Sequence, residues 1–514
     1  MHFPGSPGPT GSTSPSCRTR PTNASSSRPS TASTIVATPR RTSSRSPRAT
    51  ASSILSPTPT TASATRRCSP RISNALAASP RASRCASPFR TCVSTPSSIS
   101  RMRSSTTCET CVMSSRQEFV RRLASLEFTS ATPEVRRQLL TLFADDSIDL
   151  QDLARPVASI LLHADDDDVD ELLHAYLRNC INISYALEQR LIALQQNPPS
   201  KRLAVSLAIQ SFLNGYAWGE PLTSGDGLRD DPEYADLVRI VFDEPREERR
   251  LAATIANPRI ANDPVTAAVR AQYERHPYPR WLSMHRPEPS PDATPRRALV
   301  AGCGTGRSAI RLALHHPTWS IDAIDISLPS LGYAMRKANE MGVHNIRFLH
   351  ADLRDVSETY DRIESVGVLH HLANPTEGLR ALREQLAHDG EMVIGVYSKR
   401  ARASLARLRE LGGPGDDIRR ARERMLSALD ERELAEVEDL DFFELGHFRD
   451  TLYHAHEIEF TPLDLDAMIR DAGLRFAGFV GLGDELDLRV WDKIEQQQPG
   501  LFRHLFVMRL TSAR

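Results

Sequence analysis

A short apolar run passes into alternate glycines at Leu299-Val300-Ala301-Gly302-Cys303-Gly304-Thr305-Gly306. The apolar part predicts a buried strand, and the residues after the turn, 307–315, have a helical pattern. A second strand is predicted at 320–325, and it ends on an acid, Asp325. Strand, glycine turn, helix, strand and acid in this order are typical of a nucleotide-binding α/β unit.

The glycine turn carries most of this signal. Glycine lets the backbone approach a ligand closely, because a side chain at such a position would collide with it. Asp325 lies where the hydroxyls of a ribose would arrive. Dinucleotide sites usually have Gly-x-Gly-x-x-Gly, whereas this turn is Gly-x-Gly-x-Gly, which disfavours a nucleotide-dependent oxidoreductase.

Two later segments extend the pattern. Residues 348–353, Phe-Leu-His-Ala-Asp-Leu, predict a strand that runs into Asp352. Residues 360–372, Tyr-Asp-Arg-Ile-Glu-Ser-Val-Gly-Val-Leu-His-His-Leu, predict a further strand and its loop. With the glycine turn, these segments resemble the class I S-adenosylmethionine-dependent methyltransferases, over residues 265–510.

The resemblance implies S-adenosylmethionine as the cofactor. In that family the glycine turn lies against the methionine part, the acid after the second strand binds the ribose, and the Ala-Asp-Leu aspartate contacts the adenine. Alternative roles are a helix N-cap for Asp325 and a turn acid for Asp352. The implied cofactor-binding residues are Tyr278, Ala301, Gly302, Cys303, Gly304, Gly306, Asp325, Ile326, Asp352, Leu353, Val368 and Leu369.

Four residues are candidates for catalysis. His370 and His371 follow the fourth predicted strand, and imidazole titrates near neutrality, so either can be a base; the alternative is that both shape the pocket wall. Adjacent residues at a strand end point in opposite directions, so we expect no metal site there. Asp450 and His454 are the other candidates, from the polar segment 448–457.

The zero net charge of the chain hides a strong asymmetry. Residues 1–115 contain 15 Arg, no Lys and one acidic residue in a background rich in Ser, Thr and Pro. This composition cannot bury enough apolar surface to fold, so we expect a basic, low-complexity, disordered tail. Three interpretations remain open: a genuine tail, an organellar transit peptide, and a spurious segment from a wrong start or frame.

The rest of the chain is acidic, which disfavours a nucleic-acid partner. It has no apolar run of 18 residues, so we expect no membrane span. Six of the eight cysteines lie in the tail, and only Cys180 and Cys303 remain in the foldable part. Unpaired cysteines favour a reducing compartment, so we expect a cytoplasmic protein. The sequence does not indicate the oligomeric state.

A helical domain is predicted at 116–264, from apolar residues at helical spacing. One of its helices is expected at 203–216, which contains Ile-Gln-Ser-Phe-Leu-Asn-Gly-Tyr. That stretch and the junction 269–281 resemble the catalytic part of bacterial tetratricopeptide-repeat-containing methyltransferases. The junction holds Tyr273 and Tyr278, which we interpret either as part of a lid over the methyl-transfer pocket or as a docking linker.

The catalytic fold is expected to be an α/β, seven-stranded, mostly parallel Rossmann-like sheet, because strands and helices alternate. Strands are predicted at 296–301, 320–325, 346–350, 361–368, 391–397, 476–482 and 503–510. The core at 265–398 is followed by a helical insertion at 399–459 and by the last helix and strands at 460–514. We interpret the insertion as a cap on the acceptor side; a solvated helical hairpin is the alternative.

The predicted function is methyl transfer from S-adenosylmethionine to an unidentified small-molecule or protein acceptor. Residues 368–371, Val-Leu-His-His, stand where methyltransferases of DNA bases or glutamine carry Asn-Pro-Pro-Tyr, which disfavours those two acceptors. The alternative is a cofactor-binding scaffold whose helical domain recruits a partner without turnover.

Overall fold

The computed structural model describes residues 119–121, 123–124, 128, 131–163, 171–216, 218, 221–256, 260, 263–438, 444–483 and 485–513. The predicted tail at 1–115 lies outside these residues. Among the described residues, no helix combines the length and the apolar character that a membrane crossing needs.

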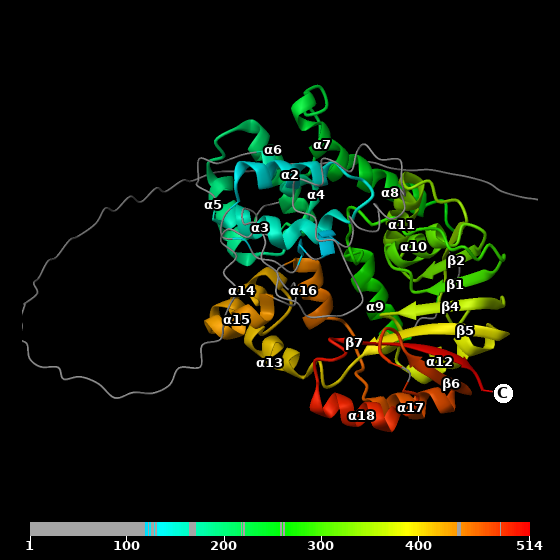
Figure 1. The fold of residues 1–514 in the computed structure, drawn as a ribbon. Coiled ribbons are helices and arrows are strands. Elements are labelled where there is room, and N and C mark those ends of the chain that lie inside the picture. Colours follow the sequence, from blue (N-terminus) through cyan, green and yellow to red (C-terminus); the bar gives the residue numbers. More distant parts are fainter. Residues whose placement is uncertain are drawn as a thin grey trace, which may run out of the picture. The chain divides into compact units, whose positions relative to one another are not determined.

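The region before the sheet is helical (Figure 1). Its helices are α2 (Pro133–Phe143), α3 (Ala154–Leu162), α4 (Glu171–Asn179), α5 (Tyr185–Gln196), α6 (Lys201–Leu213), α7 (Ala235–Val238) and α8 (Glu244–Ala252). Serine hydroxyls cap α5 and α6: Ser184 accepts from the Leu187 N–H and Ser200 from the Leu203 N–H. The helix predicted at 203–216 ends earlier, at Leu213, because the chain turns to a positive φ soon afterwards.

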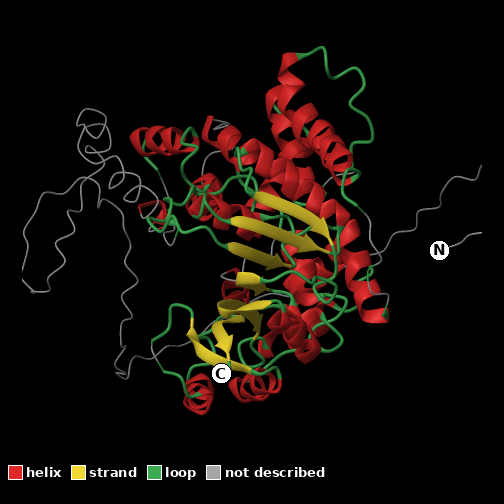
Figure 2. Cartoon of the chain, turned by 90° about the vertical axis from the view of Figure 1, so that its right-hand side faces the viewer, coloured by secondary structure: helices red, strands yellow, loops and turns green. Residues whose placement is uncertain are grey.

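The sheet has seven strands in the order β3-β2-β1-β4-β5-β7-β6, which confirms the predicted fold class (Figure 2). The strands are β1 (Arg297–Ala301), β2 (Ser320–Asp325), β3 (Ile346–His350), β4 (Tyr360–Val366), β5 (Leu386–Tyr397), β6 (Leu474–Phe479) and β7 (Leu505–Ser512). All neighbours pair parallel except β7, which is antiparallel to both β5 and β6.

Alternate residues of β1 belong to two different cores, one on each face of the sheet. Leu299 and Ala301 pack in a core that α12 (Pro375–Glu384), α17 (Pro462–Asp471) and α18 (Leu488–Gln497) help to form. Ala298 and Val300 pack in a second core, shared with α10 (Arg307–His315) and α11 (Leu328–Glu340). Helix α9 (Pro264–Arg275) leads from the helical region into the sheet.

The insertion after β5 forms α13 (Ala403–Gly412), α14 (Ile418–Ala428), α15 (Glu431–Glu438) and α16 (Leu445–Leu452). These helices have a buried cluster of their own, which includes Leu405, Met425 and Phe448. The insertion is therefore not the solvated hairpin that the sequence left as an alternative.

The helical region contacts both the insertion and the core (Figure 1). Arg422 of α14 pairs with Glu188 of α5, and the side chains are only 2% and 1% exposed. Helix α8 lies close against α11, where a Cβ on Gly332 would come within 2.3 Å of the Glu248 carbonyl oxygen. Asp149, before α3, pairs with Arg307, the first residue of α10.

Candidate functional site

The glycine turn follows β1 and is packed from two sides. Gly302 has φ +73°, and a Cβ there would lie 2.4 Å from Cγ2 of Val368. A Cβ on Gly304 would lie 2.8 Å from the carbonyl oxygen of Tyr278. The turn therefore needs glycine both for its left-handed backbone and for contact with the loop after β4 and with the junction.

Asp325 ends β2 and faces the glycine turn. Its Oδ2 accepts from the Gly304 N–H and its Oδ1 from the Ser327 N–H, each at 2.8 Å. Burial raises the pKa of this carboxyl to about 6, against the opposing effect of the backbone N–H groups. The N-cap of α11 is Ser327, so the N-cap alternative for Asp325 is wrong.

Asp352 follows β3 and is clamped by Arg354. Its Oδ1 accepts from the backbone N–H and the Nε of Arg354, at 2.9 and 2.8 Å, and its Oδ2 accepts from Nη2 at 2.7 Å. Arg354 also donates to Asp263 and Thr266, at the start of α9. Asp352 is thus a turn acid that also lies in a cavity wall. In the sequence, the arginine two residues after Asp352 was the signal that could have predicted this clamp.

A cavity of about 1030 Å³ joins these features to the junction and to α16. Most of the residues predicted to bind a cofactor line it: Tyr278, Gly302, Cys303, Gly304, Asp325, Ile326, Asp352, Leu353 and Val368. Of the four catalytic candidates, His371 and Asp450 line it.

Five predicted site residues lie behind the wall. Ala301 and Leu369 are fully buried in the core. Gly306 keeps α10 close to α11, since a Cβ there would lie 2.6 Å from that of Ala334. His370 is fully buried, and neither ring nitrogen has a hydrogen-bond partner among the described residues. His454 reaches the cavity wall only through its contacts with other side chains.

Tyr273 stands between two of the catalytic candidates. Its Oη donates to Oδ1 of Asp450 at 2.8 Å and lies 3.0 Å from Nε2 of His454. The Tyr273 hydroxyl carries one proton, which can point toward Asp450 or toward His454. Burial raises the pKa of Asp450 to about 7, whereas it lowers the pKa of His454 to about 4.

His371 stacks on His454, with ring centroids 3.6 Å apart. Its Nδ1 lies 2.7 Å from the carbonyl oxygen of His456, a contact in which only the nitrogen can donate. Burial holds the pKa of His371 well below its usual range. The ring is therefore neutral, with a lone pair on Nε2.

Tyr397, the last residue of β5, also lines the cavity, and it was not among the predicted site residues. His370 stacks on its ring at 3.7 Å, and the Arg402 guanidinium lies 3.7 Å from the ring centroid. Both faces of the ring are thus occupied, so its edge is left for the cavity. The available signal was its place at the carboxyl end of a strand beside β4.

Five side chains that line this part of the cavity are called the tyrosine–acid cluster below: Tyr273, Tyr278, His371, Tyr397 and Asp450. Tyr278 enters from the junction, and its Oη lies 2.7 Å from Nδ1 of His447 on α16. The junction and α16, separate in the sequence, are brought together on one cavity.

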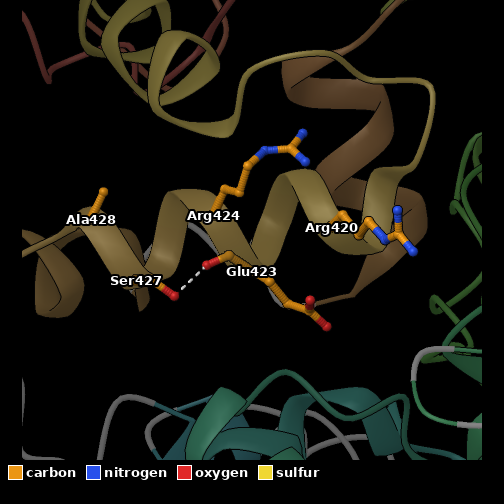
Figure 3. A pocket seen from close by; sticks show the side chains of 5 residues that line it. All are labelled: Arg420, Glu423, Arg424, Ser427 and Ala428. Carbon is orange, nitrogen blue, oxygen red and sulfur yellow. Dashed lines mark hydrogen bonds between the residues drawn. The ribbon is translucent and has the colours of Figure 1, made fainter.

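A second hollow, of about 510 Å³, lies on α14 and is lined by five residues of that helix alone (Figure 3). Arg424 already donates to the carbonyls of Gly412 and Pro414, and Ser427 donates to the carbonyl of Glu423. Its polar groups do not converge on a common point, so we do not treat it as a site.

This region is similar to known methyltransferases. A family model described as "Methyltransferase domain" matches residues 299–392. An uncharacterized protein of Synechococcus sp. is 33% identical over 253 residues, 42% of this chain and 60% of that protein. The ribosomal protein uL3 glutamine methyltransferase of Neisseria meningitidis is 30% identical over 180 residues, 34% of this chain and 50% of that enzyme. The chain thus spans half to three fifths of these relatives.

Solved structures that align with part of this chain include a protein in complex with AdoHcy and a methyltransferase. PKMT2 of Rickettsia typhi, in complex with AdoHcy, aligns with 42% of this chain and 49% of its own, with a TM-score of 0.34 and 13% identity. Magnesium protoporphyrin IX methyltransferase of Synechocystis, with bound SAH, aligns with 53% of this chain and 93% of its own, with a TM-score of 0.28 and 15% identity. The match of residues 299–392 to a methyltransferase-domain model supports S-adenosylmethionine as the cofactor.

Proposed function

We propose that the protein is an S-adenosylmethionine-dependent methyltransferase that works in the cavity between the glycine turn and α16. One observation carries the proposal: a single cavity holds both the nucleotide-type elements, Gly302 and Asp325, and the tyrosine–acid cluster. The methyltransferase-domain match over 299–392 supports it independently.

The nucleotide-type end of the cavity, which holds Gly302, Asp325 and Asp352, fits S-adenosylmethionine. An ionised Asp325 is an acceptor-only group, suited to the two hydroxyls of a ribose. Its N–H partners include Gly304 on one oxygen and Ser327 on the other, and we assign the remaining lone pairs to a ligand. Asp352, held rigid by Arg354, is our candidate for the adenine end. The cavity, at about 1030 Å³, is at the upper end of the usual range for ligand sites.

When bound, S-adenosylmethionine supplies a methyl group that is already activated on a sulfonium. The protein then has to align an acceptor with the carbon–sulfur bond, and proximity supplies most of the acceleration. Tyr278 and α16 wall the cavity where an acceptor would enter. We assign Asp450 and His371 to contact with the acceptor, and His370 and His454 to the support of that wall.

Our proposal does not include two more specific interpretations, one of the acceptor and one of the subfamily. The Neisseria relative is a glutamine methyltransferase, but residues 368–371 of this chain lack an Asn-Pro-Pro-Tyr sequence, so we do not propose its acceptor. The resemblance to tetratricopeptide-repeat-containing methyltransferases stays a prediction. A scaffold without turnover is less favoured, because the tyrosine–acid cluster lines the same cavity as Asp325.

Calorimetry on the full chain tests the proposal. We expect S-adenosylmethionine and S-adenosylhomocysteine to bind in the micromolar range, about −8 kcal/mol. The weakest affinity compatible with the proposal is a Kd of about 1 mM. If neither compound binds at that concentration, the proposal is contradicted. Conversion of the first compound into the second, measured with cell extract as the source of acceptor, separates an enzyme from a scaffold.

A further inference from the structure

The tyrosine–acid cluster presents hydrogen-bond acceptors to the cavity. Within the described part of the chain, Asp450 receives its one hydrogen bond at Oδ1, from Tyr273, which leaves Oδ2 for a ligand. Asp450 is buried, with 7% of its surface exposed, and it lines the cavity. His371 adds the lone pair of Nε2, because its Nδ1 donates to the His456 carbonyl.

The nearby cations offset the charge of Asp450 only in part: burial raises its pKa to about 7 although the Arg402 charge acts to lower it. Arg402 lies over the ring of Tyr397, and its donors go to Glu457, Glu459 and the carbonyl of Thr451. Arg449, which precedes Asp450 in the chain, is not part of the cavity wall. A buried carboxylate is costly unless a positive group pairs with it. The cluster therefore calls for a ligand that brings both donors and positive charge.

We infer that the methyl acceptor is an aliphatic amine that enters as an ammonium group and is held by Asp450 and the polar edge of the tyrosine–acid cluster. This inference rests on the proposed function and names its substrate class. An ammonium has three N–H donors and a full charge, whereas a hydroxyl brings one donor and no charge. A carboxylate acceptor would be repelled by Asp450.

The same geometry gives Asp450 a chemical role. An ammonium has no free lone pair, so it must lose a proton before it can accept a methyl group. Oδ2 of Asp450 takes that proton, and the hydrogen bond from Tyr273 to Oδ1 holds the carboxyl in place. The nitrogen lone pair then forms the C–N bond as the C–S bond breaks. The positive charge passes from sulfur to nitrogen, and S-adenosylhomocysteine leaves.

The protonation of Asp450 determines whether methyl transfer becomes faster or slower as the pH rises. Burial raises its pKa to about 7, so the carboxyl is neutral below that pH and becomes a proton acceptor above it. We expect methyl transfer to an amine to rise as the pH increases through about 7. The titratable and charged groups around Asp450 are Tyr273, Tyr278, His371, Tyr397, Arg402, Glu444, Arg449, His454 and Glu457.

A cofactor analogue tests the inference without knowledge of the acceptor. In sinefungin a CH–NH₃⁺ group replaces the S–CH₃ group, so its ammonium stands where methyl transfer would occur. We expect the full-length protein to bind sinefungin about tenfold more tightly than S-adenosylhomocysteine in calorimetry at pH 8. Asp450→Asn should erase this preference and leave the affinity for S-adenosylhomocysteine within about twofold.

Two further variants serve as controls. Asp450→Glu keeps the charge and should keep part of the preference. Glu364→Gln removes another carboxylate of the cavity wall, but one whose Oε1 already accepts from Arg362, so the preference should persist. Equal affinities in the wild type, or a preference that survives Asp450→Asn, overturn the inference. If neither compound binds, the proposed function itself fails.

A second experiment measures transfer of a labelled methyl group to pentylamine, 1-pentanol and pentanoate. We expect product from pentylamine alone, and at least a tenfold loss of rate in Asp450→Asn. Transfer to the alcohol or the acid, or none to the amine, overturns the assignment of the acceptor. Binding of S-adenosylmethionine, checked in the same samples, shows whether the proposed function stands when the acceptor assignment falls.

Discussion

The nucleotide-type end of the cavity takes its polar groups from two short segments, residues 302–327 and 352–354, whereas the tyrosine–acid cluster draws on four separate elements. Asp325 is oriented by backbone N–H groups of its own strand–turn–helix unit. Tyr273 and Asp450, joined by a hydrogen bond, lie 177 residues apart in the chain. The first end is fixed by local geometry, and the second depends on how distant helices are held.

That dependence runs through the insertion. Asp450 lies on α16, which packs with α14, and Arg422 of α14 pairs with Glu188 in the helical region. The position of the tyrosine–acid cluster therefore rests on the contact between the insertion and the helical region. Variants can separate the two ends.

Glu188→Ala should have the largest effect, because it removes the carboxylate that faces a buried arginine. We expect the free energy of unfolding to fall by about 3–5 kcal/mol, measured by chemical denaturation. Glu188→Leu combined with Arg422→Met should recover most of the loss, since an apolar pair of similar size avoids the buried charge. A single variant as stable as the wild type would show that the insertion does not depend on this pair.

Gly302→Ala tests the nucleotide-type end. Its Cβ would collide with Val368, and the backbone has a positive φ, so we expect a loss of about 2–4 kcal/mol in stability, with weakened cofactor binding. Gly342→Ala is the matched control, because Gly342 has a similar φ of +68° with nothing near its Cβ. The control should lose only about 1 kcal/mol. Equal losses in both would mean that contact with Val368 adds nothing.

Asp325→Ala should weaken cofactor binding by about 1.5–3 kcal/mol in calorimetry, the cost of losing charged hydrogen bonds to hydroxyl groups. In the wild type, affinity should rise as the pH increases through about 6, because the carboxyl is neutral below that value and ionised above it. Asp325→Asn should lack this rise. A pH-independent wild type would argue against Asp325 as the ribose ligand.

Tyr273→Phe should have the smallest effect, and only at the tyrosine–acid cluster. It removes one hydroxyl that contacts both Asp450 and His454, so turnover should fall about tenfold, equivalent to about 1.4 kcal/mol. Cofactor affinity should stay within about twofold in calorimetry. A parallel loss of affinity would mean that the two ends are not independent.

The sequence predicted the second and third strands well, because their signals are local. The strands at 320–325 and 346–350 were placed with their observed bounds, and Asp325 and Asp352 were found from their positions after those strands. The clamp by Arg354 was missed although the arginine stands only two residues after Asp352, whereas the cavity position of Tyr397 depends on where separate elements meet.

Helix α18, between β6 and β7, was not predicted from the sequence, for a second reason. Asp492 and Glu495 lie on its buried side, where they pair with Arg400, so charge interrupts the apolar period that would have marked the helix. Strand β6 was also misplaced, at 476–482 instead of Leu474–Phe479, and its pairing with β7 shifts register between Phe476 and Phe479.

The ion pairs of the helical region have a consequence for modularity. Glu188 reaches the insertion through Arg422, and Asp149 reaches the first turn of α10 through Arg307. The chain thus closes a loop of contacts: helical region to core, core to insertion, and insertion back to helical region. A fragment that begins at residue 265 would keep every strand of the sheet but lose both carboxylates. The sheet and its helices are therefore not a detachable module, and a fusion or a truncation at this boundary should change the protein on both sides of it.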